Sequence, residues 1–87
     1  MNLDYDNLLI QEYKHWAIFL HSNQQYLGRT YVLARRENAF DFMELTLEEA
    51  QEFFLIGKVL KNSLEYLFHP DLMNYASLGN TFRHLHI

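Results

Sequence analysis

One long helix is the strongest structural signal in the sequence. Thr46 is followed three residues later by Glu49, the pattern of a capping box at a helix N-terminus. From Leu47 onward, apolar residues recur at helical spacing. Pro70 ends the pattern, because proline cannot continue a helix. We therefore predict a helix over residues 46–68.

The segment before this helix favours a β-hairpin. Residues 15–21 are a compact apolar run with aromatic and β-branched members, typical of a buried strand. Residues 26–35 predict a second, antiparallel strand, with residues 22–25 as the connection. Gly28 indicates either a bulge or a close approach of the backbone, for example to a ligand.

Three further elements complete the predicted domain. Apolar spacing over residues 3–13 predicts a short N-terminal helix. Residues 71–78 and 81–87 predict two more strands, joined by a turn at Gly79-Asn80. The sequence thus predicts an α+β fold with an antiparallel sheet of about four strands, one long helix and a short N-terminal helix.

Composition limits the classes of protein to consider. The 87 residues are 49% hydrophobic, enough to form the core of a single domain over residues 1–87. The absence of cysteine excludes disulfides and thiolate metal sites. A net charge of −4 argues against a nucleic acid polymer as partner. Without a signal segment or a long apolar run, we expect a cytoplasmic protein with no membrane contact.

Two histidines stand apart from the other three. On a strand, His84 and His86 would point to the same face, beyond a turn that holds Asn80 and Thr81. Such a pair suits phosphoryl chemistry, because one neutral imidazole can attack phosphorus while its neighbour donates hydrogen bonds. The alternatives are two exposed strand histidines, or a metal site that needs a third ligand. We expect neither a metal nor a cofactor.

The residues around this pair resemble the histidine-triad (HIT) family. The family motif is His-φ-His-φ-His-φ-φ, where φ is apolar, and His84-Leu85-His86-Ile87 is similar to its first part. The resemblance covers roughly residues 15–87. Its other segments are Trp16–Leu20, Tyr26–Arg29, Glu44–Glu49, Phe68–Asp71 and Asn74–Asn80.

The resemblance implies a function and a set of site residues. Members of the family bind nucleoside monophosphate moieties, hydrolyse or transfer them through a nucleotidyl-histidine, and are often homodimers. By position, His86 is the nucleophile and His84 helps to shape the site. Three polar residues match positions near the phosphate oxygens: Asn74, Asn80 and Thr81. Asn23 matches a position in the hairpin that can approach the ribose. The implied ligand is a purine nucleoside monophosphate or a nucleotide conjugate.

Simpler roles stay open for some of these residues. Asn80 also fits a hairpin turn, and Asn74 also fits a polar strand residue that faces solvent. Many family members carry histidine where Arg29 stands. Together with Arg35 and Arg36, this arginine either engages phosphates or lies solvated at a strand end.

The third histidine of the triad is missing, because the sequence stops at Ile87. We therefore expect a domain that is incomplete at its C-terminus and whose turnover is low or absent. The alternative function is a catalytically impaired nucleotide-binding protein or a dimeric interaction module.

Overall fold

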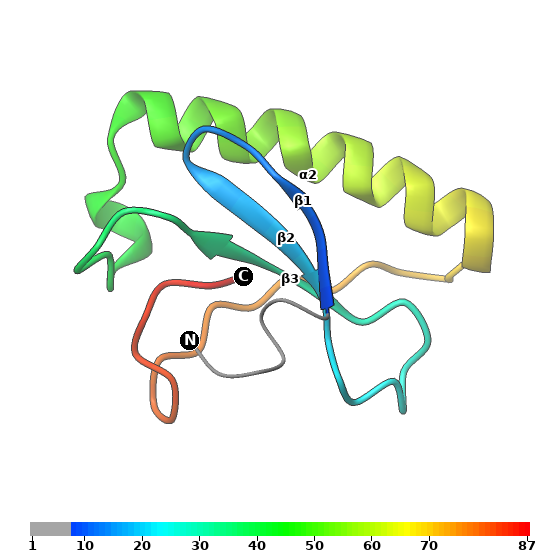
Figure 1. Cartoon of the computed structure of the whole chain (residues 1–87). Coiled ribbons are helices and arrows are strands. Elements are labelled where there is room, and N and C mark those ends of the chain that lie inside the picture. The colour runs from blue at the N-terminus through cyan, green and yellow to red at the C-terminus, as the bar shows by residue number, and fades with distance from the viewer. Residues whose placement is uncertain (1–7) are drawn as a thin grey trace.

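The computed structural model describes residues 8–87 and confirms the α+β class. An antiparallel sheet of three strands, in the order β1-β2-β3, lies beside one long helix (Figure 1). The elements are β1 (Leu9–Glu12), β2 (Trp16–Leu20), β3 (Thr30–Ala34), a short 3-10 helix (Phe42–Glu44) and α2 (Leu47–Phe68).

The predicted capping box starts α2. The Thr46 hydroxyl accepts a hydrogen bond from the Glu49 N–H (3.1 Å), and the Glu49 carboxylate accepts one from the Thr46 N–H (2.9 Å). Glu49 is buried and also accepts from Nε of Arg36 (3.0 Å). Burial alone would raise the pKa of Glu49, but the hydrogen bonds from Arg36 and Thr46 outweigh it and lower the pKa. The first turn of α2 is therefore linked through Glu49 to Arg36 in the preceding loop.

The end of α2 differs in one detail from the sequence prediction. A residue before proline favours extended backbone, yet His69 adopts the left-handed conformation with φ of 48°. Its N–H donates to the Glu65 carbonyl (3.0 Å), so His69 caps the helix before Pro70 turns the chain.

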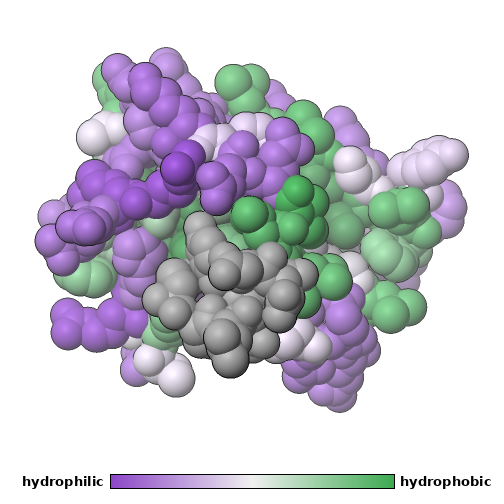
Figure 2. Space-filling model, viewed as in Figure 1, coloured by the Kyte–Doolittle hydropathy of each residue, from purple (hydrophilic) through white to green (hydrophobic). Residues whose placement is uncertain are grey.

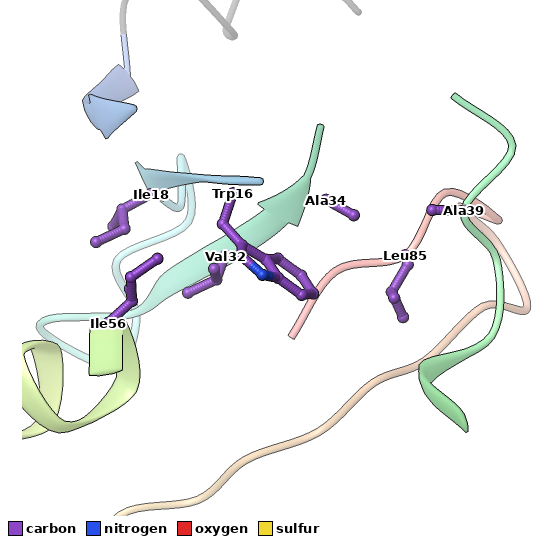
Figure 3. Packing of buried hydrophobic residues seen from close by; sticks show 7 residues of the cluster. All are labelled: Trp16, Ile18, Val32, Ala34, Ala39, Ile56 and Leu85. Carbon is purple, nitrogen blue, oxygen red and sulfur yellow. The ribbon is translucent and has the colours of Figure 1, made fainter. Parts of the chain in front are cut away.

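The main core lies between the sheet and α2. Alternate residues of β2 and β3 point toward the helix, and Figure 3 shows Trp16 among them. The Trp16 indole N–H donates to the Glu49 carbonyl (2.9 Å), and its ring centroid lies 5.1 Å from that of Phe53. The buried cluster consists of Trp16, Ile18, Val32, Ala34, Ala39, Ile56 and Leu85.

The opposite face of the sheet carries a second buried cluster. Ala17, Phe19 and Leu33 form it, and Leu9 and Tyr31 pack against it. Tyr31 also lines the pocket described below, so this face of the sheet leads to the candidate site. The sheet is thus packed on both sides.

The N-terminal helix predicted over residues 3–13 does not extend through residues 9–12. Residues 3–7 lie outside the described residues, whereas Leu9–Glu12 form strand β1. This strand pairs with β2, with Leu9 opposite Phe19 and Glu12 opposite Ala17. Pairing with a buried strand overrides the helical spacing of the apolar residues.

The two strands predicted after α2 are also wrong as strands. Residues 71–78 form no strand, and most of them are exposed. Of residues 81–87, only the last three run along β3. Val32 and Ile87 exchange two backbone hydrogen bonds (2.8 and 3.0 Å), and the Ala34 N–H donates to the Leu85 carbonyl (3.1 Å). The single bridge that results pairs Leu33 with His86.

The hairpin connection is longer than predicted, because β3 starts at Thr30. Gln24 holds this loop together by donating to the carbonyls of His21 (2.7 Å) and Arg29 (2.8 Å). Gly28 has φ of 83°, and a Cβ built on it would lie 2.8 Å from the Phe68 ring. The close neighbours of Gly28 among the described residues are thus side chains at the end of α2.

Gly28→Ala should lower the free energy of unfolding by about 1–3 kcal/mol, because it adds left-handed strain and a clash with Phe68. Gly57→Ala is the matched control. Gly57 lies inside α2 with nothing near its would-be Cβ, so this change should stabilise by roughly 0.5–1 kcal/mol. Urea denaturation measures both; equal effects of the two changes would contradict the loop packing.

Candidate functional site

A pocket of about 500 Å³ lies beside β3, α2 and the segment 73–78. Its polar lining includes His21, Arg29, Lys61, Asn74 and His86. No Asp or Glu side chain among the described residues lines it, although the chain as a whole carries a net charge of −4. Lys61 is paired with Glu65 (2.7 Å), so the positive charge of the pocket comes mainly from Arg29, and it suits an anionic ligand.

His86 enters this pocket from the segment paired with β3. Its Nδ1 lies 2.8 Å from the His84 carbonyl oxygen. Because a carbonyl oxygen only accepts, Nδ1 carries the proton, and Nε2 of the neutral ring has a free lone pair. Phe82 and Tyr31 flank the imidazole, with ring centroids 5.3 and 6.4 Å away. The ring is held in one orientation with a nucleophilic nitrogen available.

His84 occupies a different place. Its Nε2 donates to the Ala34 carbonyl (2.6 Å), and the side chain does not line the pocket. His84 thereby ties its own backbone to the end of β3. Its carbonyl is the group that orients His86, so His84 acts on the site through His86.

The other residues predicted for the site separate into two groups. Asn74 lines the pocket together with His86. Asn80 and Thr81 are exposed and do not line it. Asn23 is also exposed, and its side chain accepts from the Gln25 N–H (2.9 Å) within the hairpin loop.

Sequence reasoning missed the contribution of His21, which it treated as an isolated histidine. The His21 N–H donates to the Arg29 carbonyl (2.9 Å), so the two residues face each other at the end of the hairpin. Its imidazole stands edge-on to Tyr31, with centroids 6.0 Å apart. The register of the hairpin, rather than any motif, brings His21, Arg29 and Tyr31 together.

Only one of the three arginines considered from the sequence belongs to the pocket. Arg35 pairs with Glu12 (3.8 Å) and donates to the Tyr13 carbonyl, and Arg36 pairs with Glu49 (3.0 Å). Arg29 lines the pocket and has no carboxylate within 4.0 Å among residues 8–87. Its charge is therefore available to a ligand.

The pKa of His21 is lowered by burial first, and then by the charges of Arg29 and His86. Its Nδ1 accepts from the Asn23 N–H (3.0 Å), so the neutral ring carries its proton on Nε2. The unfolded chain binds a proton at this residue more readily than the folded protein does. His21 therefore makes stability fall as the pH drops below its ordinary pKa of 6.5.

His21→Asn should reduce this loss of stability between about pH 7.5 and about pH 5.5. Asparagine keeps an oxygen that accepts the Asn23 N–H but does not titrate. Urea denaturation at both pH values gives the difference for each protein. An equal loss in the wild type and the variant would contradict the lowered pKa.

Two features absent from residues 8–87 bear on the class of site. No group of three or more His, Asp or Glu side chains there is arranged to hold a metal ion. No helix in the same range is long and apolar enough to cross a membrane. The cytoplasmic location stays a prediction from the sequence.

Comparison with known proteins identifies the family. No curated protein gives a significant match to the chain. The family model described as HIT domain matches residues 2–87, nearly the whole sequence. The match includes the segment that carries His84 and His86, as well as the hairpin and α2. The chain therefore belongs to the HIT domain family.

Proposed function

We propose that this protein binds a nucleotide by its phosphate and transfers the nucleotidyl group through His86. The observation that carries the proposal is the orientation of His86, whose Nδ1 is committed to the His84 carbonyl at 2.8 Å while the ring lines the pocket. That orientation leaves Nε2 to attack phosphorus. A fixed nucleophile is what in-line displacement requires.

The reaction has two steps. In the first, the Nε2 lone pair of His86 attacks the α-phosphorus, a P–N bond forms, and the P–O bond to the leaving group breaks with its electron pair. In the second, water or another hydroxyl acceptor attacks the same phosphorus and gives up its proton to the solvent, while the P–N bond breaks and its electron pair returns to Nε2. Arg29 and the Asn74 amide line the pocket and can offset the negative charge on phosphoryl oxygens, whereas the Lys61 ammonium there is paired with Glu65 (2.7 Å).

The rest of the pocket suits a nucleoside. Apolar side chains of α2 and the following segment line it, among them Phe53, Leu60 and Met73. Tyr75 and Phe82 add aromatic rings on which a base can stack. We propose a purine nucleoside monophosphate, or a conjugate of one, as the ligand.

We further propose that two copies of the chain associate. Several large apolar side chains on α2 are exposed, including Leu55 (68%), Val59 (60%) and Tyr66 (80%). Hydrophobic residues, coloured green, also reach the surface on the face viewed in Figure 2. These side chains would be covered in a homodimer.

Binding of AMP and of adenosine to the unmodified protein tests the nucleotide proposal. The cationic lining should make AMP bind at least tenfold more tightly than adenosine, because a charge-assisted hydrogen bond contributes about 1.5–3 kcal/mol. Isothermal titration calorimetry measures both affinities. Equal affinities, or no binding of AMP, would contradict a phosphate site.

If AMP binds but no nucleotidyl group is transferred, the alternative function holds. The protein would then be a nucleotide-binding module without turnover.

A further inference from the structure

A row of side chains crosses the sheet on the face away from α2 and ends at His86. Phe19 of β2 lies directly opposite Leu9 of β1 on one side and Tyr31 of β3 on the other. Residues opposite each other in antiparallel strands point to the same face of the sheet, so these three side chains line up. His86 continues the row, because it pairs with Leu33, two residues beyond Tyr31 on β3.

The row holds Tyr31 in place from the side of the core. Phe19 is fully buried, and its ring stacks on that of Tyr31, with centroids 5.1 Å apart and an angle of 14° between the ring planes. Tyr31 is half-buried and lines the pocket, whereas Phe19 does not line it. Tyr31 is therefore the residue through which the second buried cluster reaches the candidate site.

Tyr31 also contacts the imidazole of His86. The ring centroids lie 6.4 Å apart and the planes are nearly perpendicular at 83°, the geometry of a T-shaped aromatic pair. Aromatic side chains reach such diagonal neighbours on adjacent strands. By contrast, the hydrogen bond from Nδ1 joins His86 only to the His84 carbonyl, two residues away in the same segment. The contact with Tyr31 is thus the one that relates the imidazole to the sheet.

The second ring beside His86 is held less firmly. The Phe82 ring centroid lies 5.3 Å from that of the imidazole, but Phe82 is 46% exposed. It belongs to residues 70–83, which form no strand and which no hydrogen bond joins to the rest of residues 8–87. Of the two aromatic neighbours, Tyr31 is the one with a fixed position.

We propose that Tyr31 is a positioning residue for His86. The Tyr31 ring, fixed by Phe19, keeps the imidazole in the orientation in which Nδ1 donates to the His84 carbonyl. This inference rests on the proposed function, in which Nε2 attacks phosphorus. Without the Tyr31 ring, the imidazole can turn about its Cβ–Cγ bond and carry Nε2 away from the line of attack. The chemical step then slows, whereas nucleotide binding does not change.

Tyr31→Leu tests this role in the chemical step. At a saturating concentration of the p-nitrophenyl ester of AMP, the first-turnover release of p-nitrophenolate should slow roughly two- to tenfold, as expected for the loss of one aromatic pair. The affinity for AMP, measured by calorimetry, should stay within about twofold of the wild type. Tyr31→Phe keeps the ring and should restore the wild-type rate. An unchanged rate in Tyr31→Leu, or weaker AMP binding alone, would overturn the proposal.

Two further variants control for folding and for the loss of a tyrosine in general. Tyr31→Met should slow the reaction as Tyr31→Leu does, and it replaces that variant if leucine prevents folding, because methionine fills irregular gaps without a ring. Tyr26→Leu is the matched control. Tyr26 is 72% exposed and does not line the pocket, so this variant should react at the wild-type rate. An equal slowing in Tyr26→Leu would contradict a specific role of Tyr31.

NMR spectra of the histidine ring nitrogens test the positioning without any nucleotide. In the wild type and in Tyr31→Phe, neutral His86 should carry its proton on Nδ1, whereas Tyr31→Leu should show a mixture of both tautomers. The wild-type tautomer alone in Tyr31→Leu would overturn the positioning role. If the wild type releases no p-nitrophenolate, the proposed function fails, and the NMR spectra still decide whether Tyr31 positions His86.

Discussion

Replacing His86 by asparagine should abolish nucleotidyl transfer. Asparagine keeps a donor for the His84 carbonyl, which accepts from Nδ1 of His86 at 2.8 Å, but it has no nitrogen lone pair for phosphorus. The rate of the first turnover should fall by a factor on the order of 10³ or more. The release of p-nitrophenolate from the p-nitrophenyl ester of AMP measures this step, even when later turnovers are slow.

The matched control is His69→Asn. His69 is exposed, caps α2 with φ of 48° and does not line the pocket. Asparagine tolerates that backbone conformation, so both stability and the first-turnover rate should stay close to wild type. A His86→Asn variant that kept the wild-type rate would rule out His86 as the nucleophile.

Trp16→Ala should have the largest effect on folding. The Trp16 side chain is fully buried, contacts Phe53 of α2 and donates to the Glu49 carbonyl. Its truncation leaves a cavity between the sheet and the helix, which should cost about 3–5 kcal/mol in the free energy of unfolding. That is a large share of the roughly 5–15 kcal/mol available to a small domain.

Phe54→Ala provides the comparison for Trp16→Ala. Phe54 belongs to the same helix but is 63% exposed, so its loss should cost less than about 1 kcal/mol. Chemical denaturation followed by circular dichroism measures both variants. A similar cost for the two would contradict the packing of α2 on β2 through Trp16.

The sequence predicts correctly those elements whose ends depend on residues close together in the chain. The capping box of Thr46 and Glu49 and the break at Pro70 set the ends of α2, because these effects depend on neighbours in sequence. The apolar run over residues 15–21 also predicts strand β2 correctly. By contrast, β1 has apolar residues at helical spacing and becomes a strand only by pairing with β2. Residues 71–78 have strand-like composition but pair with none of the strands in the described part of the chain.

The candidate site likewise contains residues that a local motif predicts and residues that only the fold brings together. The spacing and surroundings of His84 and His86 marked that segment in the sequence, although only His86 lines the pocket. His21 and Arg29 lie eight positions apart in a segment without a phosphate-binding motif. Their proximity depends on the hairpin register, in which Leu20 faces Thr30. A second strand beginning at residue 26, as the sequence predicts, implies a shorter loop and therefore a different register from the one in the structure.

The proposed function requires that His86 form a covalent bond to the phosphorus of a nucleotide. Its most direct test is mass spectrometry of the protein after brief reaction with the p-nitrophenyl ester of AMP. We expect one added adenylyl group per chain, located on His86 by peptide mapping and lost in acid because the bond is a P–N bond. A protein that binds AMP but gains no mass, or is labelled on another residue, would contradict it.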